Sequence, residues 1–474
     1  MDLMLKIAGE IGTKSAPTRR RFLRVLASNA RAALRRAGLR GAVEPRWSRV
    51  FVRTNEPAAA SALTRVFGVH SIFETVPVRF DSLEDLVGRA TPLLQPVVRG
   101  RTFALRVRRR GEHAFRSRDV AVALGDSLRP SSAGVDLGHP EVELPIEIAG
   151  DVAHLLLEGR SGPGGLPVGV GGRALALFSG GFDSPVATWM AMRRGMAVDL
   201  LVCDLGGCGQ VDAALEVARE LAMTWAPGVE PRAHVVDLAP VVGALRARVD
   251  PGIRQVVLKR AMYRAGTLLG ERLGADGLIT GEALGQVSTQ TIRNLSVAED
   301  AAGLPVVRPL IGMDKEEIIA RARQIGTHDA SARVQEHCNI ATGRVETAAR
   351  LHAVVGAEGR LDESFVAAAV ERAVAVDLTT WAPGPAPEHV VEEVPRDAVV
   401  VDVREAHEGP PVGDVRLSFS GVQEWSSGLE LSKRYLFVCS NGSRSEIVAH
   451  ELRLRGIDAY SLAGGIPRLP TRAA

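Results

Sequence analysis

The chain contains a glycine-rich turn whose residue types suit the binding of an anion. Its residues are Ser179, Gly180, Gly181, Phe182, Asp183 and Ser184. An apolar run at 174–178 predicts a buried parallel strand before the turn. The segment 185–194, which starts with proline and is followed by glycine, predicts a helix after it. Backbone N–H groups converge at such a junction and the helix dipole adds roughly half a positive charge, so we expect the turn to cradle phosphate.

The side chains of the turn suit a nucleoside triphosphate. The hydroxyls of Ser179 and Ser184 can donate to phosphate oxygens, and Asp183 can hold a Mg²⁺ ion that bridges the phosphates. The Gly-Lys-Ser/Thr ending of a Walker loop is absent. The turn resembles instead the PP-loop of ATP pyrophosphatases, which cleave ATP between the α- and β-phosphates and leave AMP on a substrate oxygen. The alternative interpretation is an ordinary tight turn between a strand and a helix.

A second reactive loop begins at Cys439. The apolar run 435–438 predicts a buried strand before it, and a helical segment reaches Arg455 after it. A cysteine at the head of a loop that enters a helix N-terminus has its thiolate stabilised by the dipole and the loop amides. Arg444 adds a positive charge. The alternative is a structural cysteine at a strand end, because cysteines are often simply buried.

This loop resembles the active loop of rhodanese domains. Four residues separate Cys439 from Arg444, whereas cysteine phosphatases place five there, and the shorter loop fits one that carries a persulfide. The segments 400–404 and 462–465 also fit that family. The segment 405–420 departs from it, because it is rich in proline and glycine and lacks the usual Gly-His-Ile stretch. We therefore expect a compact domain with an intact active loop.

Composition narrows the class of protein. A length of 474 residues predicts about three domains, and 46% apolar residues are ample for several cores. Four cysteines without a CxxC pair argue for a reducing compartment and against a disulfide scaffold or structural zinc. The N-terminus does not read as a signal peptide, and no run approaches the roughly 18 apolar residues of a membrane span. We expect a cytoplasmic protein with no membrane segment and no metal site of its own.

Charge is distributed unevenly along the chain. The net charge is +3, but residues 1–125 hold 24 Lys and Arg against 10 Asp and Glu, a net of +14. The remaining 349 residues carry 34 basic and 45 acidic side chains, a net of −11. This asymmetry predicts that the N-terminal part meets a polyanion with salt-dependent affinity. The alternative is a solvated charged face, with an arginine-rich composition that reflects a GC-rich genome.

The pattern of elements predicts the domain organisation. Residues 1–75 and 76–170 both show an α+β pattern. From 171 onward, strands near 174–179, 197–204, 232–238, 277–281 and 307–311 alternate with helices, which predicts a doubly wound parallel sheet with its ligand at the carboxyl edge. Residues 345–378 are alanine-rich and predicted to be helical, 381–389 form a proline-rich linker, and the last unit covers 390–474.

The whole chain resembles the ThiI family of tRNA 4-thiouridine synthetases. Besides the PP-loop, the blocks 281–291, 308–310 and 314–317 look like blocks of that family. The resemblance implies a multidomain α/β and α+β fold. Its parts are a ferredoxin-like domain (1–75), a THUMP RNA-binding domain (76–170), a PP-loop ATP pyrophosphatase domain with a helical extension (171–380), the linker (381–389) and a rhodanese-like sulfur-carrier domain (390–474).

The resemblance also implies a reaction and its participants. The reaction replaces O4 of the uridine at position 8 of tRNA by sulfur, with ATP and Mg²⁺ as cofactors. The implied partners are tRNA, a cysteine desulfurase as persulfide donor, a disulfide reductant and a thiamine sulfur-carrier protein, since the family also serves thiazole formation in thiamine synthesis. A homodimer is implied as well.

Residue roles follow partly from the resemblance, for the two cysteines and the arginines, and partly from the chemistry of the residues themselves. Cys439 would carry the persulfide and Cys338 would resolve it through a disulfide. Lys315 stands one residue into a helix whose Asp314 and Glu317 form a capping box, from which it can reach the ATP phosphates. The catalytic set is Cys439, Cys338, Asp183, Lys315 and Arg444. The ATP-binding set is Ser179, Gly180, Gly181, Phe182, Asp183, Ser184, Gly281 and Gln290, with Glu282 and Gln286 lining the uridine or ATP pocket. The RNA-binding set is Arg106, Arg108, Arg109, Arg110 and Arg116.

Two cysteines and one histidine take no part in these assignments. Cys203 is interpreted as core, and Cys208 as a loop thiol without a role. His337 beside Cys338 is interpreted as a surface histidine.

Three rival functions differ in what they require. A sulfur carrier for thiamine synthesis with vestigial RNA modification needs only Cys439, so intact Asp183, Lys315 and Cys338 argue against it. An amidating ligase of the PP-loop class would need a glutamine-hydrolysing domain, and this chain has a persulfide-type loop instead. A non-catalytic RNA-binding protein explains neither loop.

Overall fold

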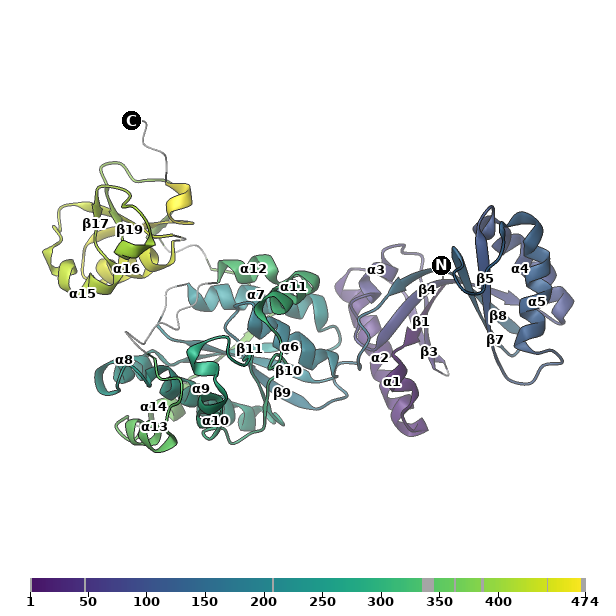
Figure 1. Ribbon diagram of the computed structural model, residues 1–474, viewed down its shortest axis with the longest axis horizontal. Coiled ribbons are helices and arrows are strands. Elements are labelled where there is room, and N and C mark those ends of the chain that lie inside the picture. The colour runs from purple at the N-terminus through teal and green to yellow at the C-terminus, as the bar shows by residue number, and fades with distance from the viewer. Residues whose placement is uncertain are drawn as a thin grey trace. The chain divides into compact units, whose positions relative to one another are not determined.

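The computed structural model describes residues 2–46, 48–206, 209–334, 345–361, 364–384, 388–440 and 442–469 (Figure 1). The chain divides into two compact units. One comprises 1–174, 188–199 and 221–231, and the other comprises 175–187, 200–220 and 232–474. Across the described residues, none of the helices combines the length and the apolar character that a membrane crossing needs.

The N-terminal part is built on one eight-stranded sheet, in the order β2-β3-β1-β4-β8-β7-β5-β6. Its strands are β1 (Asp2–Ile7), β2 (Ala42–Arg46), β3 (Arg49–Arg53), β4 (Val69–Arg79), β5 (Thr102–Arg110), β6 (Gly134–Val135), β7 (Val142–Ala149) and β8 (Val152–Ser161). The long strand β4 passes through the predicted boundary at residue 75. It pairs with β1 over residues 69–75 and with β8 over residues 71–79, so the two N-terminal domains share a sheet.

Helices cover one face of this sheet because its strands alternate apolar and polar side chains. The helices are α1 (Gly9–Gly12), α2 (Ala16–Arg36), α3 (Ala59–Leu63), α4 (Leu83–Val98) and α5 (Ser117–Leu128). Leu3 and Leu5 of β1 pack with Leu26 of α2, while Phe103 of β5 packs with Leu94 of α4. The opposite face of the same strands carries charged side chains.

A six-stranded sheet follows, in the order β13-β12-β9-β10-β11-β14. Its strands are β9 (Arg173–Leu177), β10 (Ala197–Asp204), β11 (Arg232–Asp237), β12 (Leu278–Ile279), β13 (Val306–Val307) and β14 (Val374–Asp377). The predicted strand at 307–311 is therefore much shorter and starts one residue earlier. Pro309 has no backbone N–H with which to extend it.

The helical prediction for 345–378 is wrong at its end. β14 lies antiparallel on the edge strand β11, with Val374 opposite Val235 and Val376 opposite Ala233. Its alternate valines suit a strand, and their pairing with β11 outweighs the local alanine content.

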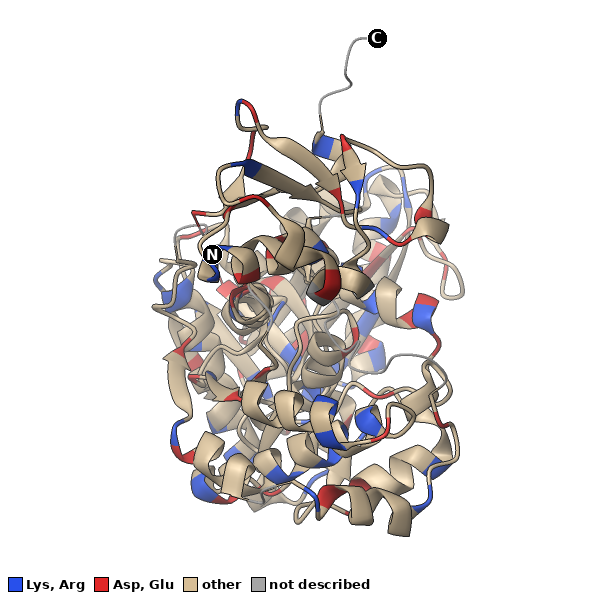
Figure 2. Ribbon diagram, turned by 90° about the vertical axis from the view of Figure 1, so that its left-hand side faces the viewer, with Lys and Arg blue, Asp and Glu red and all other residues tan. Residues whose placement is uncertain are grey.

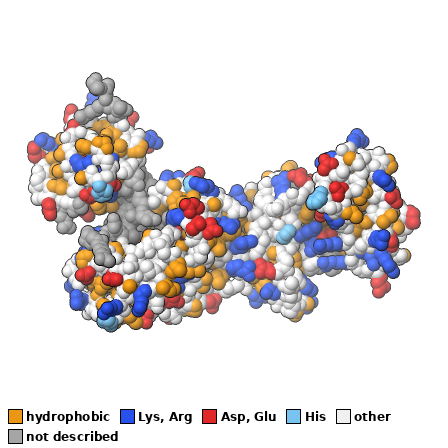
Figure 3. Space-filling model, viewed as in Figure 1, with side chains coloured by type: hydrophobic (Ala, Val, Ile, Leu, Met, Phe, Trp, Pro, Cys, Tyr) orange, Lys and Arg blue, Asp and Glu red, His pale blue; other side chains and the backbone are white. Residues whose placement is uncertain are grey.

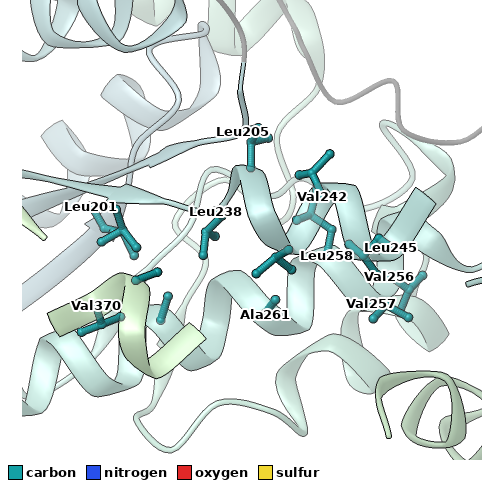
Figure 4. Close-up of a cluster of buried hydrophobic side chains, with 14 of the residues drawn as sticks. Leu201, Leu205, Leu238, Val242, Leu245, Val256, Val257, Leu258, Ala261 and Val370 are labelled. Carbon is teal, nitrogen blue, oxygen red and sulfur yellow. The ribbon is translucent and has the colours of Figure 1, made fainter. Parts of the chain in front are cut away.

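Helices pack on this parallel sheet as a doubly wound fold requires. They are α6 (Asp183–Arg193), α7 (Gln210–Trp225), α8 (Ala239–Arg248), α9 (Arg254–Leu273), α10 (Ile292–Glu299), α11 (Lys315–Ile325), α12 (His328–Arg333), α13 (Leu351–Glu358) and α14 (Ser364–Glu371). Figure 4 shows part of the core, a cluster that includes Leu201, Leu238, Val242 and Leu245 of α8 and Ala261 of α9. Burying each large aliphatic side chain contributes about 1.5–3 kcal/mol.

The C-terminal part is a rhodanese-like unit on a five-stranded sheet, in the order β15-β19-β18-β16-β17. All of its pairs are parallel. The strands are β15 (Val390–Val391), β16 (Val399–Asp402), β17 (Val415–Arg416), β18 (Arg434–Val438) and β19 (Asp458–Leu462), with the helices α15 (Val422–Trp425) and α16 (Ser443–Leu454). The predicted fold class is confirmed for all parts of the chain.

Basic and acidic positions are interspersed along the helices that face the viewer in Figure 2.

Candidate active site

The glycine-rich turn joins β9 to α6 as predicted, but α6 starts at Asp183 and not at Pro185. Proline is tolerated in the first helical turn, whose N–H groups have no intrahelical partner. The N–H groups of Ser179 and Gly180 both donate to Oγ of Ser184, at 3.2 Å. Ser184 thus holds the turn in a curved shape at the N-terminus of α6, where the first N–H groups of a helix have no intrahelical partner and can bind phosphate.

Two glycines let neighbouring elements press on this turn. Gly180 has φ +80°, and a Cβ on it would lie 2.7 Å from the Cα of Ala214 in α7. A Cβ on Gly281, just after β12, would lie 2.8 Å from the carbonyl carbon of Asp183 and from the N of Ser184. Any side chain at either position would displace the backbone of the turn, so these glycines are needed for its shape.

Asp183 is contacted by two side chains that are far from it in the sequence, those of Lys315 and Gln286. Nζ of Lys315 lies 2.8 Å from Oδ1 of Asp183, and Nε2 of Gln286 donates to Oδ2 at 2.8 Å. The same ammonium stands 5.6 Å from the centre of the Phe182 ring. A carboxylate, an ammonium and an amide therefore converge beside the phosphate cradle.

The predicted capping box positions Lys315 at the start of α11. Oδ1 of Asp314 accepts from the N of Glu317 at 2.8 Å, and Oε2 of Glu317 accepts from the N of Asp314 at 3.1 Å. This reciprocal pair fixes where the helix begins, and with it the direction from which Lys315 reaches Asp183.

The donor set fits ATP with Mg²⁺. Asp183 supplies the hard carboxylate oxygen that Mg²⁺ prefers, and the open space beside Gly181, where an added Cβ would meet only Oγ of Ser179 at 3.7 Å, leaves room for phosphate oxygens near the backbone. When bound, Mg²⁺ would neutralise phosphate charge at Asp183.

Glu282 does not line an open pocket, in contrast to the prediction. Its carboxylate is buried and engaged by Nζ of Lys259 at 2.7 Å, Oη of Tyr263 at 2.5 Å and Nε of Arg308 at 2.8 Å. Burial alone would raise the pKa of Glu282, but the Lys259 ammonium and the other donors overcome it and lower the pKa to about 2. The carboxylate is therefore an anchor for the chain directly after Gly281.

Gln290 also stabilises the segment after Gly281, because its Oε1 accepts a hydrogen bond from the N of Ala283 at 3.3 Å. Sequence reasoning missed Lys259 and Tyr263. They lie one helical turn apart on α9, but no local signal linked them to Glu282, which follows them by 23 and 19 residues.

The second predicted loop joins β18 to α16. Cys439 is fully buried, and Oγ of Ser445 lies 3.6 Å from its Sγ. Gly442, with φ +97°, precedes the helix, and a Cβ there would lie 3.2 Å from both the N of Gly464 and the O of Leu462. The segment 462–465 that matched the rhodanese pattern thus packs against the loop.

Arg444 is bound to a carboxylate that the prediction did not include. Its two terminal nitrogens donate to the two oxygens of Glu408, both at 2.6 Å. The hydrogen bonds from Arg444 lower the pKa of Glu408 to about 2.

The shortened segment after β16 is anchored by a buried charge. Asp402, with no exposed surface, accepts from Arg404 at 3.0 Å and from Arg416 at 2.7 Å. The same two arginines donate to the carbonyls of Glu408, Gly409 and Pro410. These contacts fix the segment that lacks the Gly-His-Ile stretch.

Cys338 lies outside the described residues, as do Cys208 and His337. Cys203, at the end of β10, packs partly buried against the core, as predicted.

The arginines of β5 do not all share one face. Arg106, Arg108 and Arg110 are exposed on the face without helices, where Arg108 and Arg110 line a groove of about 830 Å³ together with Lys6, Arg19, Arg49 and His70. Figure 3 shows basic side chains gathered over β1, β4 and β5. Arg109 points the other way and binds Nδ1 of His113 at 3.0 Å. Arg116 is exposed just before α5.

Two carboxylates lie within the basic face. Glu143 lines the same groove and pairs with Arg106 at 3.3 Å. Glu147 binds Arg49 at 2.6 Å and Lys6 at 3.8 Å. Among the described residues, Arg108 has neither an ion-pair nor a hydrogen-bond partner.

Known proteins match every part of this architecture. Family models match as the ThiI ferredoxin-like domain at 3–72, the THUMP domain at 80–158 and the thiamine biosynthesis protein (ThiI) at 169–362. A tRNA sulfurtransferase of Desulfurococcus amylolyticus is 38% identical, over 98% of this chain and 97% of its own length. The chain belongs to the tRNA sulfurtransferase (ThiI) family. Its enzyme class is therefore that of a transferase.

Two further matches describe the family. A probable tRNA sulfurtransferase of Sulfurisphaera tokodaii is 39% identical over 77% of this chain but 97% of its own length, so the family includes shorter members. The crystal structure of a 4-thiouridine synthetase–RNA complex with bound ATP has a TM-score of 0.70 and 26% identity, and covers 79% of this chain and 98% of that one.

Proposed function

We propose that this chain makes 4-thiouridine at position 8 of tRNA, in an ATP-dependent reaction that uses a persulfide on Cys439. The observation that carries the proposal is the contact of Lys315 with Asp183 beside the glycine-rich turn. A sulfur carrier alone has no use for this arrangement, whereas adenylation of a substrate oxygen requires it.

In the first step, O4 of the uridine attacks the α-phosphorus of ATP and pyrophosphate leaves. The backbone donors of the turn and the ammonium of Lys315 stabilise the charge that develops on the departing phosphates. Asp183 would hold Mg²⁺, which would neutralise charge on the phosphates. Gln286 keeps the carboxylate of Asp183 oriented through its hydrogen bond at 2.8 Å.

In the second step, sulfur replaces the activated oxygen. A cysteine desulfurase transfers sulfur to Cys439, the persulfide attacks C4 and AMP leaves. The Cys338 thiolate then attacks the Cys439 sulfur, which releases the thiolated base and forms a Cys338–Cys439 disulfide. In a variant of this step, Cys338 attacks the persulfide first and frees sulfide next to C4. In both cases a reductant must restore the two thiols.

The basic face of the N-terminal sheet is the proposed tRNA-binding surface. Arg106, Arg108 and Arg110 share the face that bears the groove, so their proposed role is contact with phosphate. Arg109 binds His113 and Arg116 lies just before α5, so we propose phosphate contacts for these two residues only on the family resemblance. The domain boundaries, the linker at 381–389 and a homodimer are proposed on the family resemblance.

Sulfur transfer for thiamine thiazole synthesis is a second proposed role. The family model that matches 169–362 is described as a thiamine biosynthesis protein, which supports it. Cys439 would act there with a thiamine sulfur-carrier protein as acceptor. A protein that is mainly such a carrier, with vestigial RNA modification, is the alternative.

The test is thiolation of bulk tRNA with ATP, Mg²⁺, cysteine and a cysteine desulfurase, followed by nucleoside mass spectrometry. We expect 4-thiouridine that requires ATP and disappears in Cys439→Ser, while the matched control Cys203→Ser retains it. Absence of any thionucleoside, with persulfide still formed on Cys439, would favour the carrier alternative.

A further inference from the structure

The cation of the Cys439 loop is already neutralised within the folded protein. Arg444 follows Cys439 by five residues and forms two parallel hydrogen bonds with Glu408, both at 2.6 Å. Such bidentate pairs are the strongest and most directional that arginine makes. Both side chains are about one-quarter exposed, so the pair lies at the surface of the loop.

Glu408 is held in place and is not a loose surface partner. Its Oε2 accepts from the N of Glu405 at 2.8 Å, and its carbonyl accepts from Arg404 at 3.2 Å. Arg404 is itself fixed on the buried Asp402. The anchored segment therefore presents the carboxylate of Glu408 to Arg444 in one orientation.

Arg444 also interacts electrostatically with Cys439. The pKa of Arg444 is raised mainly by the hydrogen bonds to Glu408, burial opposes this rise, and Cys439 adds a smaller electrostatic contribution that raises it. Both terminal nitrogens of Arg444 are engaged by Glu408, so an anion that enters the loop finds neither of them free.

We propose that Glu408 is a specificity-determining residue that keeps small anionic sulfur donors, such as thiosulfate, from loading Cys439, so that the loop takes sulfur from a persulfide on a partner protein. This inference rests on the proposed role of Cys439 as a persulfide carrier. The carboxylate repels a dianion and withholds the guanidinium that would bind it.

The excluded reaction needs no further reagent. The Cys439 thiolate would attack the outer sulfur of thiosulfate, the sulfur–sulfur bond would break, and sulfite would leave with the electron pair. The product is the same Cys439 persulfide that a desulfurase forms. Only the recognition of the donor differs.

The experiment compares two donors on the full chain. Wild type, Glu408→Gln and the matched control Glu424→Gln are incubated with thiosulfate, or with cysteine and a desulfurase. Persulfide on Cys439 is followed by mass spectrometry. Glu424 is exposed on α15, so its change removes the same charge without touching Arg444.

We expect Glu408→Gln to raise kcat/KM for thiosulfate about tenfold or more, as expected when one charged hydrogen-bond donor becomes available. Loading by the desulfurase should stay close to that of wild type in all three proteins. Thermal unfolding confirms that the variants are folded, and Glu408→Ala replaces the glutamine variant if that one is not.

Desulfurase loading without any gain for thiosulfate in Glu408→Gln would overturn this inference alone. An equal gain in Glu424→Gln, or a wild type that loads equally fast from both donors, would overturn it too. If the desulfurase fails to load wild-type Cys439, the carrier role itself is wrong and the inference falls with it.

Discussion

The ammonium of Lys315 lies 2.8 Å from the carboxylate of Asp183, although 132 residues separate them. Each residue stands at a helix N-terminus, Asp183 on α6 and Lys315 on α11. Their contact places the Lys315 ammonium beside the turn that would bind phosphate. There it can stabilise the negative charge that develops as pyrophosphate leaves.

Removal of this cation should block adenylation but not sulfur loading. We expect Lys315→Ala to lower transfer of labelled AMP from ATP to tRNA by about a hundredfold or more, because a donor to the developing charge is lost. Persulfide on Cys439 should form normally. The control Lys433→Ala changes an exposed lysine paired with Glu430 and should leave AMP transfer intact. Unchanged AMP transfer in Lys315→Ala would show that the site is misassigned.

The close approach at Gly281 gives a second prediction. A methyl group there would lie 2.8 Å from the backbone of Asp183 and Ser184, so Gly281→Ala should distort the turn and weaken ATP binding about tenfold or more. Gly312→Ala is the matched control, since nothing lies within 4 Å of its added Cβ. Isothermal titration with ATP measures both variants. Equal affinities would mean that the turn tolerates the methyl group.

The charge on Glu282 links stability to pH. Its pKa is lowered in the folded protein to about 2, so it stabilises the fold above the pKa of the unfolded chain, near 4.5, and this contribution is lost as pH falls toward 2. Glu282→Gln leaves Lys259 and Arg308 without their carboxylate and should lower the free energy of unfolding by about 3–5 kcal/mol at neutral pH. Urea unfolding between pH 7 and 3 measures the difference. It should shrink as pH falls below 4.5, and a difference independent of pH would contradict the assignment.

The basic face predicts how tRNA binding responds to salt. Arg108→Ala and Arg110→Ala should each weaken tRNA binding and reduce the slope of log affinity against log salt by about one. The control Arg89→Ala removes an exposed arginine on α4 that is paired with Asp85, and should change neither quantity. Filter binding at several salt concentrations provides the data. A slope unchanged in both β5 variants would remove this face from the interface.

The two proposed reactive cysteines should be needed for sulfur transfer but not for tRNA binding. Cys439→Ser and Cys338→Ser should each abolish tRNA thiolation and leave tRNA affinity unchanged, because neither residue belongs to the N-terminal sheet that bears the basic face. Normal thiolation by Cys338→Ser would exclude its resolving role.

The sequence predicted those parts of the site whose cause is local. The strand–turn–helix pattern around Asp183 and the capping box at Lys315 depend on neighbours within a few residues, and both formed as expected. The same holds for the loop between Cys439 and Arg444. The five parallel strands of the central sheet followed from the alternation of strands and helices.

What the sequence could not predict depends on pairings over long distances. β14 became a strand because β11 offered it an open edge, although the sequence around Val374 is alanine-rich. Glu282 reads as a polar residue at a sheet edge, and only the fold shows that Lys259 and Tyr263 enclose it. The pairing of Glu408 with Arg444 could not be predicted from the sequence either, because Arg444 follows Glu408 by 36 residues.

In the proposed reaction, sulfur on Cys439 reaches tRNA only after ATP has activated the uridine. The most direct measurement loads Cys439 with radioactive persulfide sulfur, removes the desulfurase and adds tRNA with or without ATP in a single turnover. We expect labelled 4-thiouridine at position 8 in amounts up to one per loaded protein with ATP, and none without it. Equal transfer without ATP, or label that stays on Cys439 when ATP and tRNA are both present, would contradict it.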